Sequence, residues 1–278
     1  MKVKISTITP CYKGEKYLSL FLKELPQQTI FDQIEVVLDH NEPTISECLM
    51  VKEFQERYPG RLKHIIVNKV EPISKSMNRC IHRSSGEYVA IWNIDDLRTP
   101  WSLESQAKVL DENEDIGVSH GNFIIVPRFG LTEGSFVDHL ELGVSPSKEL
   151  TRSMVLGPFF MWRKELNKTI GYFDEQLVSG ADFDLAVRLA AHSKVGMTSK
   201  ILGYYLDEGK GASTRPNNKQ ILERTVIELR YGISDKIDQR YVTEAKNKYD
   251  VSKIYWGDES FHVTEIVPDY KNFWSNNG

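Results

Sequence analysis

Two groups of acidic side chains have the type and spacing to do chemistry. The first, Asn93-Ile94-Asp95-Asp96, directly follows the apolar run from Tyr88 to Trp92, which predicts a buried strand. Carboxylates at the end of such a strand lie at the rim of a sheet, where open α/β folds bind their ligands. Their oxygens suit magnesium or manganese, which share their remaining positions with water and substrate phosphates. The alternative is a loop in which Asp95 and Asp96 only cap the next helix.

The second group is Asp182, in the segment from Gly180 to Leu189. Apolar residues recur there at helical spacing, which places Asp182 in the first turn of a helix. The free backbone N–H groups and the helix dipole favour an ionised carboxylate at that position. An ionised carboxylate can act as a general base, although helix capping alone is the alternative interpretation.

Alternating strand and helix patterns through about residue 125 predict an α/β fold with a mainly parallel sheet. The expected strands are Val3 to Thr9, which Pro10 ends, Ile34 to Leu38, Leu62 to Val67, the run before Asn93, and Gly117 to Val126. The expected helices are Glu15 to Leu25, one with a Thr44–Glu47 capping box and Cys48, Leu49 and Phe54 inward, one capped by Ser74, and one starting at Thr99-Pro100. Residues 127–150 are expected to form long loops beside the active site.

Composition excludes several classes of function. The chain has 278 residues and a formal net charge of −4, from 35 basic and 39 acidic residues, without long blocks of one sign. This charge balance argues against nucleic-acid binding. Cys11, Cys48 and Cys80 are far apart and odd in number, which indicates a reducing compartment without a disulfide framework. With no apolar run long enough to cross a bilayer, we expect a cytoplasmic protein.

Several motifs together resemble those of the family 2 glycosyltransferases, which are inverting, nucleotide-sugar-dependent enzymes of the GT-A fold. In chain order they are Ile8-Thr9-Pro10-Cys11-Tyr12, Glu35 to Asp39, Lys75 to Arg79, Gly86 to Asp95, Met161 to Leu166 and Gly171 to Leu189. The resemblance extends from Ile5 to about Thr214 and implies a Rossmann-like GT-A domain with a central mainly parallel mixed sheet flanked by helices, followed by a helical or irregular extension.

The resemblance also implies a role for individual residues. Asn93-Ile94-Asp95 takes the place of the family's DxD motif, so Asp95 would hold Mn²⁺ or Mg²⁺ on the donor diphosphate and Asn93 would face the ribose. Asp39 would recognise the base and Asp182 would be the catalytic base. Asp207 lies where the family can have a histidine near the metal and would be a second metal ligand, with a solvated loop aspartate as the alternative interpretation. The other expected nucleotide-sugar contacts are Thr9, Pro10, Tyr12, Lys75, Asn78, Ile94 and Asp96.

Two departures from the family pattern bear on the chemistry. Asn93 replaces an acidic residue and lacks its charge, which predicts weaker metal binding. Ala181 stands where the family has an acidic residue before the base. Both departures favour an alternative interpretation, a catalytically silent sugar-nucleotide-binding protein of the same fold.

The resemblance predicts a metal-dependent inverting glycosyltransferase that moves a sugar, with a UDP-sugar the favoured donor, to a hydroxyl of a glycan or glycoconjugate acceptor. Such an enzyme is expected to serve cell-surface polysaccharide or glycan synthesis. The expected domains are 1–214, the catalytic domain, with a nucleotide-binding half to about 98 and an acceptor-binding half from about 99, and 215–278, an extension packed on the core. The sequence leaves the oligomeric state and any peripheral membrane contact open.

Overall fold

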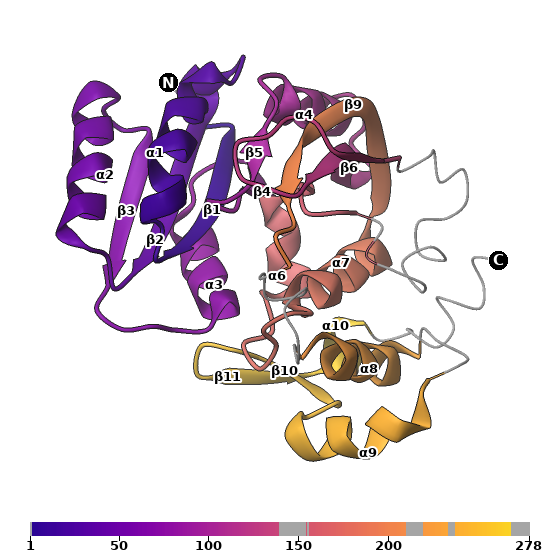
Figure 1. Cartoon of the computed structure of the whole chain (residues 1–278). Helices are drawn as coiled ribbons and strands as arrows, with labels where there is room; N and C mark the ends of the chain where they lie inside the picture. The colour runs from indigo at the N-terminus through magenta and orange to yellow at the C-terminus, as the bar shows by residue number, and fades with distance from the viewer. Residues whose placement is uncertain (1, 139–153, 155, 210–218, 233–236, 268–278) are drawn as a thin grey trace.

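The computed structural model describes residues 2–138, 154, 156–209, 219–232 and 237–267. A nine-stranded sheet has the strand order β3-β2-β1-β4-β8-β6-β9-β5, with β7 paired to β6 (Figure 1). Its strands are β1 (Ile5–Tyr12), β2 (Ile34–Asn41), β3 (Leu62–Val67), β4 (Tyr88–Ile91), β5 (Leu97–Arg98), β6 (Ile116–Val126), β7 (Ser135–Val137), β8 (Met161–Arg163) and β9 (Lys194–Leu206). A separate hairpin consists of β10 (Lys253–Trp256) and β11 (Glu259–His262).

The helices separate most of these strands. They are α1 (Glu15–Glu24), α2 (Ile45–Arg57), α3 (Ile73–Arg83), α4 (Ser102–Asp111), α6 (Asn167–Ile170), α7 (Ala181–His192), α8 (Gln220–Tyr231), α9 (Gln239–Lys248) and α10 (Val263–Ile266). Short 3-10 helices are η1 (Leu25–Gln27), η2 (Phe31–Gln33) and η3 (Lys164–Leu166).

The sheet is parallel in its first half and mixed in its second. β1 pairs in parallel with β2 and β4, and β2 with β3. β8 pairs antiparallel with both β4 and β6, whereas β6 and β9 are parallel. The predicted mixed α/β architecture is therefore confirmed, and the carboxyl ends of β1, β2 and β4 meet at one edge, as the ends of parallel strands must.

Two hydrophobic clusters cover opposite faces of the sheet because successive strand side chains point to opposite sides. On β4, Val89 and Ile91 join a cluster with α3 and α7, while Tyr88 and Ala90 join one with α1 and α4. A strand buried on both faces needs a continuous apolar run, and that is the pattern before Asn93.

Pro10 does not end the first strand, as the sequence had predicted, because β1 continues to Tyr12. On the β4 side, the last residue of β1 with a partner is Ile8, which pairs with Ile91. Pro10 lies beyond this point, so its missing N–H breaks no hydrogen bond with β4. The longer strand carries Tyr12 out to the edge of the sheet.

The predicted inward face of α2 is wrong at Leu49, which is 60% exposed. The buried residues are Glu47, Val51 and Phe54, at positions i, i+4 and i+7 of one helical face. With 3.6 residues per turn, Leu49 lies about 200° around the helix from Glu47. The predicted capping box between Thr44 and Glu47 is confirmed, and it brings the Glu47 carboxylate inward.

Two predicted helix starts are displaced because their residues bond to other elements. α3 begins at Ile73 after Pro72, and the Ser74 hydroxyl donates to the Leu177 carbonyl instead of capping the helix. α4 begins at Ser102, two residues after Pro100. Thr99 uses its backbone N–H and its hydroxyl to donate to β9 carbonyls at Leu202 and Ile201.

Buried ion pairs attach the C-terminal elements to the rest of the fold. Arg230 on α8 donates to the carboxylates of Asp174 at 2.9 Å and Asp184 at 2.7 Å, and all three side chains are fully buried. The Tyr231 hydroxyl also donates to Asp184, at 2.9 Å. Removing one partner of such a cluster leaves a buried charge uncompensated, which typically costs about 3–5 kcal/mol.

Aromatic residues of the β10–β11 hairpin pack on the segment after α6. Trp256 stacks on Phe261 with ring centroids 4.2 Å apart and meets Tyr172 edge-on at 5.9 Å. Figure 1 shows this hairpin and α8 to α10 on the α7 side of the molecule. The C-terminal aromatic residues Tyr270, Phe273 and Trp274 lie outside the described residues, as do residues 139–150 of the predicted loops.

Candidate active site

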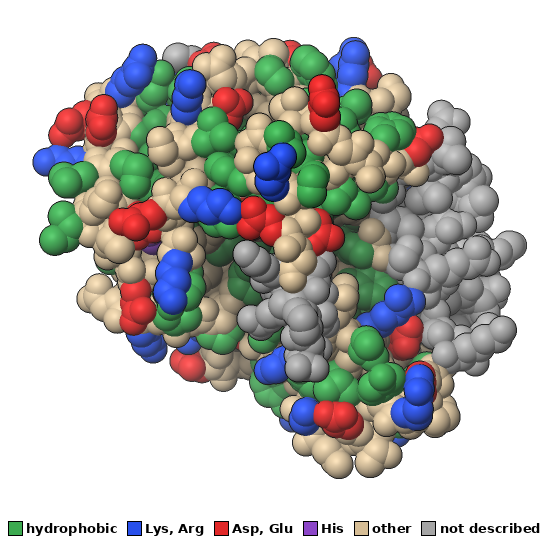
Figure 2. Space-filling model, in the orientation of Figure 1, with side chains coloured by type: hydrophobic (Ala, Val, Ile, Leu, Met, Phe, Trp, Pro, Cys, Tyr) green, Lys and Arg blue, Asp and Glu red, His purple; other side chains and the backbone are tan. Residues whose placement is uncertain are grey.

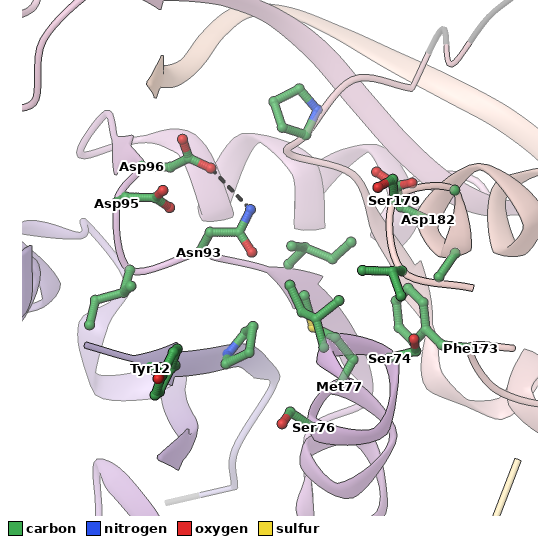
Figure 3. A pocket seen from close by; sticks show the side chains of 18 of the residues that line it. Tyr12, Ser74, Ser76, Met77, Asn93, Asp95, Asp96, Phe173, Ser179 and Asp182 are labelled. Atoms are coloured by element: carbon green, nitrogen blue, oxygen red, sulfur yellow. Dashed lines mark hydrogen bonds between the residues drawn. The ribbon is translucent and has the colours of Figure 1, made fainter. Parts of the chain in front are cut away.

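A cavity of about 760 Å³ opens at the sheet edge where β1 and β4 end. Both candidate carboxylates, Asp95 and Asp182, line it, and Figure 3 shows them on facing sides. Its other polar lining residues include Tyr12, Tyr17, Asn41, Glu71, Ser74, Ser76, Asn93, Asp96, Ser179, Tyr205, Gln220 and Arg224. The cavity therefore brings together residues from the first strand, the middle of the chain and the C-terminal helix α8.

The connection from β4 to β5 holds Asn93, Asp95 and Asp96 in three different environments. Asp96 is 2% exposed, and its carboxylate accepts hydrogen bonds from the Leu206 N–H at 3.0 Å and from Asn93 Nδ2 at 3.1 Å. The Trp92 indole N–H donates to the Asp96 carbonyl. Asp95 is partly exposed and lines the cavity (Figure 3). Burial of Asp96 thus fixes the turn, and Asp95 is the carboxylate that the turn presents.

The electrostatics of this turn favour a bound cation. Burial raises the pKa of Asp95, and the negative charge of Glu208 raises it further, against the opposing effect of Lys16. Burial and the charge of Asp95 also raise the pKa of Asp96. Carboxylates whose ionised forms are disfavoured in this way are stabilised by a nearby positive charge. Hard carboxylate oxygens at a cavity wall fit Mn²⁺ or Mg²⁺.

At the end of β1, Pro10 and Tyr12 also line the cavity. Tyr12 is 44% exposed, and Lys13 Nζ lies 5.1 Å from its ring centroid. Ile94 lines the cavity too, although it is only 7% exposed. An exposed aromatic ring at a sheet edge offers a flat surface for a planar ligand.

Four of the predicted donor contacts, Thr9, Asp39, Lys75 and Asn78, do not line the cavity. Asp39 is fully buried, and Arg79 donates to it through Nε at 2.5 Å and Nη2 at 3.1 Å.

Asn41, which does line the cavity, also donates to Asp39, at 2.8 Å. Asp39 therefore lies behind the cavity wall, where its hydrogen bonds hold Asn41 and Arg79 in place. Thr9 is fully buried in β1, and Lys75 lies 3.8 Å from the Glu71 carboxylate at the surface.

Asn78 and Ser74 position the segment that leads to Asp182. Asn78 exchanges hydrogen bonds with the Phe173 backbone, accepting from its N–H at 2.8 Å and donating to its carbonyl at 2.9 Å. The Ser74 hydroxyl donates to the Leu177 carbonyl. The resemblance had assigned Asn78 to the donor. Its two backbone bonds join α3 to Phe173, and its contact with the donor stays a prediction.

Asp182 lies in the first turn of α7, as predicted, but its electrostatic environment differs from the prediction. Burial raises its pKa to about 6, and the negative charge of Glu223 adds to this effect, against the lowering by the Phe183 N–H. Removal from water thus outweighs the helix N-terminus that was expected to favour the ionised form. A carboxylate with this pKa is ionised at neutral pH and is a stronger base than an ordinary aspartate.

Asp207, the second predicted metal ligand, follows β9 and does not line the cavity. Its carboxylate accepts a hydrogen bond from the Gly209 N–H at 2.9 Å, and its own N–H donates to the Val126 carbonyl. The neighbouring residue Glu208 forms a salt bridge with Lys16, whose Nζ lies 2.8 Å from Glu208 Oε1.

A buried polar cluster that the sequence did not predict adjoins the cavity. Among the described residues, Cys11, His40 and Glu47 have ligand atoms within 4.8 Å of one another. His40 Nε2 lies 3.6 Å from the Glu47 carboxylate, and His40 Nδ1 lies 3.2 Å from His64 Nε2. Burial lowers the pKa of His40 and raises that of Cys11 to about 12. Both cysteines and histidines are widely spaced in the sequence, so only the fold brings these groups together.

The sequence also gave no indication of the cavity residues on α8. Gln220 and Arg224 both line the cavity and are four residues apart, so they share a helical face. The sequence had indicated a helical or irregular extension in this part of the chain, but not which of its side chains would face the cavity. Figure 2 shows basic and acidic side chains intermixed over the visible surface, in agreement with the modest net charge.

The fold is that of the GT-A glycosyltransferases. A crystal structure of Staphylococcus aureus TarS in complex with UDP-GlcNAc superimposes with a TM-score of 0.65 and 22% identity, covering 88% of this chain and 72% of that one. The mannosyltransferase PcManGT from Pyrobaculum calidifontis, in complex with GDP-Man and Mn²⁺, gives a TM-score of 0.60 and 15% identity, covering 99% and 75%. These identities are low, so the two structures establish the fold.

The chain belongs to glycosyl transferase family 2, whose sequence profile it matches over residues 6–171. An uncharacterised glycosyltransferase of Methanocaldococcus jannaschii is 24% identical over 200 residues, which cover 69% of this chain and 66% of the relative. The poly(ribitol-phosphate) beta-N-acetylglucosaminyltransferase TarS of Staphylococcus aureus is 24% identical over 216 residues, which cover 75% and 36%. The resemblance predicted from the motifs is thereby confirmed, and the chain spans less than two thirds of the length of these relatives.

Within the described parts of the chain, no helix combines the length and the apolar character needed to cross a lipid bilayer.

Proposed function

We propose that the protein is a metal-dependent inverting glycosyltransferase that transfers a sugar from a nucleoside-diphosphate sugar to a hydroxyl of a glycan or glycoconjugate acceptor. A UDP-sugar is the favoured donor, and cell-surface polysaccharide or glycan synthesis is the proposed pathway. One observation carries the proposal: Asp95 and Asp182 line the same cavity from facing sides, at the edge where the parallel strands end.

The two carboxylates have different proposed roles because their surroundings differ. Asp95 is presented by the buried turn, beside Asp96 and Asn93, and would hold Mn²⁺ or Mg²⁺ through its oxygens. The bound cation would neutralise charge that develops on the departing diphosphate. Asp207 stays a proposed second ligand, with Glu208 beside it facing Lys16.

Asp182 acts as the general base in this proposal. With its pKa raised to about 6 by burial, it is ionised at neutral pH and accepts the proton of the attacking hydroxyl. The hydroxyl attacks the anomeric carbon opposite the leaving diphosphate, so the new glycosidic bond has inverted configuration. No covalent enzyme intermediate is required.

The remaining donor contacts divide into direct and indirect ones. Pro10, Tyr12, Asn93 and Ile94 line the cavity and are proposed to touch the nucleotide sugar. Asp39 is proposed to act on the base through Asn41, to which it is hydrogen-bonded.

The TarS complexes with UDP and UDP-GlcNAc support the choice of a UDP-sugar, since TarS is similar to this chain in sequence as well as in fold. We also propose the division into a catalytic domain, 1–214, and an extension, 215–278.

The alternative of a catalytically silent sugar-nucleotide-binding protein has one specific observation in its favour. Ala181, which takes the place of the family's acidic residue, lines the cavity next to Asp182 and offers no hydrogen-bonding group to an acceptor. A silent protein would bind the nucleotide sugar but would not depend on Asp182.

Nucleotide binding and transfer are tested separately. The melting temperature is measured with UDP, GDP, UDP-GlcNAc and GDP-mannose, each with and without MnCl₂, because a ligand at 100 times its Kd stabilises the folded state by about 2.7 kcal/mol. Release of the nucleoside diphosphate is then measured with a panel of glycan acceptors. If no nucleotide raises the melting temperature, with or without metal, the proposal fails.

Two variants distinguish the enzyme from the silent protein. Asp182→Asn is expected to lower transfer about 10²- to 10⁴-fold and to leave nucleotide stabilisation unchanged. Asp95→Asn is expected to abolish the part of that stabilisation that depends on MnCl₂. Nucleotide binding without transfer, and without any effect of Asp182→Asn, identifies the silent alternative.

A further inference from the structure

Glu223 of α8 receives hydrogen bonds from the backbone of the segment that immediately precedes α7. Its fully buried carboxylate accepts from the N–H groups of Val178 at 3.0 Å, Ser179 at 2.6 Å and Gly180 at 2.7 Å. The Tyr249 hydroxyl donates to the same carboxylate at 3.2 Å. Carboxylates that receive several N–H donors hold them strongly, because charged hydrogen bonds are about twice as strong as neutral ones.

This carboxylate anchors the chain at the point where it enters α7. The N-cap residue is Gly180, and Glu223 accepts from its N–H and from those of the two preceding residues, whereas the first-turn N–H of Phe183 donates to the Asp182 side chain. Glu223 lies 43 residues further along the chain than Gly180 and supplies this acceptor from α8.

Gly180 allows the close approach. A Cβ atom at this position would lie 3.2 Å from Glu223 Cβ, tighter than ordinary contact.

α8 is held in register with α7 by contacts at its other end. Arg230 and Tyr231 both bond to Asp184, which lies on α7 two residues after Asp182. Glu223 and the Arg230–Tyr231 pair therefore fix α8 on both sides of the turn that carries Asp182. Gln220 and Arg224, which flank Glu223 on the same helix, line the cavity with Asp182.

We propose that Glu223 is a positioning residue for the catalytic base: it holds the backbone of residues 178–180 from the C-terminal helix and so fixes Asp182 at the cavity wall. This inference rests on the proposed role of Asp182. It makes the C-terminal extension part of the active site, because the residue that orients the base belongs to the extension.

The charged groups around Asp182 affect its titration, which can be measured. Its own helix carries Asp184, which is neutralised by Arg188 and Arg230. The other charged residues that line the cavity are Glu71, Asp95, Asp96 and Arg224.

Glu223 is the residue whose negative charge raises the pKa of Asp182 in addition to burial. Removing that charge is therefore expected to move the titration of Asp182 to lower pH.

Glu223→Gln keeps the length of the side chain but removes its charge and replaces one acceptor oxygen with an NH₂ group. We expect kcat to fall about 10- to 100-fold, because small displacements of a catalytic group have effects of this size. Nucleotide stabilisation in the presence of MnCl₂ is expected to remain as in the wild type. Glu223→Asp keeps the charge, so it is expected to retain the wild-type titration of Asp182 while losing kcat through its shorter reach.

Tyr231→Phe is the matched control for a purely structural effect. It removes an α8 contact to Asp184 but none to residues 178–180, so it is expected to lower the melting temperature without changing the pH profile of the folded enzyme. A pH profile for Glu223→Gln that matches that of Tyr231→Phe would overturn the inference.

Two measurements that need no turnover separate this inference from the proposed function. The Asp182 carboxyl is titrated by ¹³C NMR, and amide hydrogen exchange is followed at Val178, Ser179 and Gly180. In Glu223→Gln we expect a lower Asp182 pKa and faster exchange at these amides. If both stay at wild-type values, the inference is overturned even when the wild type transfers sugar. If both change but the wild type transfers none, the proposed function alone is overturned.

Discussion

Asn93 donates a hydrogen bond from Nδ2 to the buried carboxylate of Asp96, at 3.1 Å (Figure 3). This contact gives a physical reason for the amide at the first position of the acidic motif. Asp95 and Asp96 already have raised pKa values, and an acidic residue at position 93 would add a third negative charge without a donor for Asp96. The residue that departs from the family pattern therefore completes the turn that presents Asp95.

Asn93→Asp is expected to lower the melting temperature of the metal-free protein, because it replaces a hydrogen bond by like-charge repulsion at a buried site. The expected loss of stability is about 1–3 kcal/mol. Added MnCl₂ is expected to restore more stability to this variant than to the wild type, since three carboxylates attract the cation more strongly than two. Thermal unfolding with and without MnCl₂ checks both effects, and an equal response of the two proteins would contradict the metal site.

Asp182→Asn is expected to make the protein more stable at neutral pH while it removes transfer. The folded-state pKa of Asp182 is about 6, against an ordinary value of 3.8, so its ionised form is less favourable in the folded than in the unfolded protein. A difference of about 2 pKa units corresponds to at most about 3 kcal/mol of lost stability at pH 7, and an amide does not carry this cost.

The stabilising effect of Asp182→Asn is expected to depend on pH. Well below pH 3.8, Asp182 is protonated in both the folded and the unfolded state, and the cost disappears. The difference in melting temperature between Asp182→Asn and the wild type should therefore shrink as the pH falls from 7 to 4. Because both proteins share every other titrating group, a difference that stays constant over this range would show that the pKa of Asp182 is not raised.

The pH dependence of catalysis should report the same group. With Asp182 as general base, kcat/KM is expected to fall about tenfold for each pH unit below about 6, as the carboxylate takes up its proton in the free enzyme. Steady-state rates measured from pH 5 to 8 at saturating MnCl₂ check this. An acid limb near pH 4, the ordinary range of an aspartate, would instead argue for a base in a more solvated environment.

Asn78→Ala tests whether this residue contacts the donor or positions the segment that leads to Asp182. The variant leaves the Phe173 N–H and carbonyl without their partner in a buried place, which is expected to cost about 2–4 kcal/mol of stability. We expect kcat to fall while the KM for the nucleotide sugar changes little, because the segment held by Asn78 leads to Asp182. A large rise in the donor KM with unchanged kcat would instead support direct contact with the donor.

Gly171→Ala is expected to loosen the β10–β11 hairpin. Gly171 has a φ of +72°, and a Cβ atom there would lie 2.1 Å from the Trp256 ring. Gly257→Ala is a matched control, since Gly257 has a similar φ of +60° but open space around its Cβ. We expect about 1 kcal/mol of lost stability for the control and several kcal/mol for Gly171→Ala, measured by urea unfolding. Equal losses would mean that the indole moves aside without cost.

Sequence patterns predicted those features that depend on neighbours in the chain. The alternation of apolar strands and helices, the capping box of Thr44 and Glu47, and the first-turn position of Asp182 are all local, because periodicity and capping act over a few residues. Leu49 shows the limit of this reasoning. Its apolar character indicated burial, but the face of α2 that points inward is chosen by Glu47, Val51 and Phe54 together.

By itself, the sequence determined the family, the mixed α/β fold and the two acidic groups, because ordered motifs and periodic apolar residues are properties of the chain. The tertiary structure decided which groups meet. It placed Asn78 against the Phe173 backbone, and it placed Glu223 against the segment before Asp182. It also raised the pKa of Asp182, because burial outweighs the effect of the helix N-terminus, which is the part that the sequence predicted. Removal from water depends on every element packed around a side chain, and no local pattern contains that information.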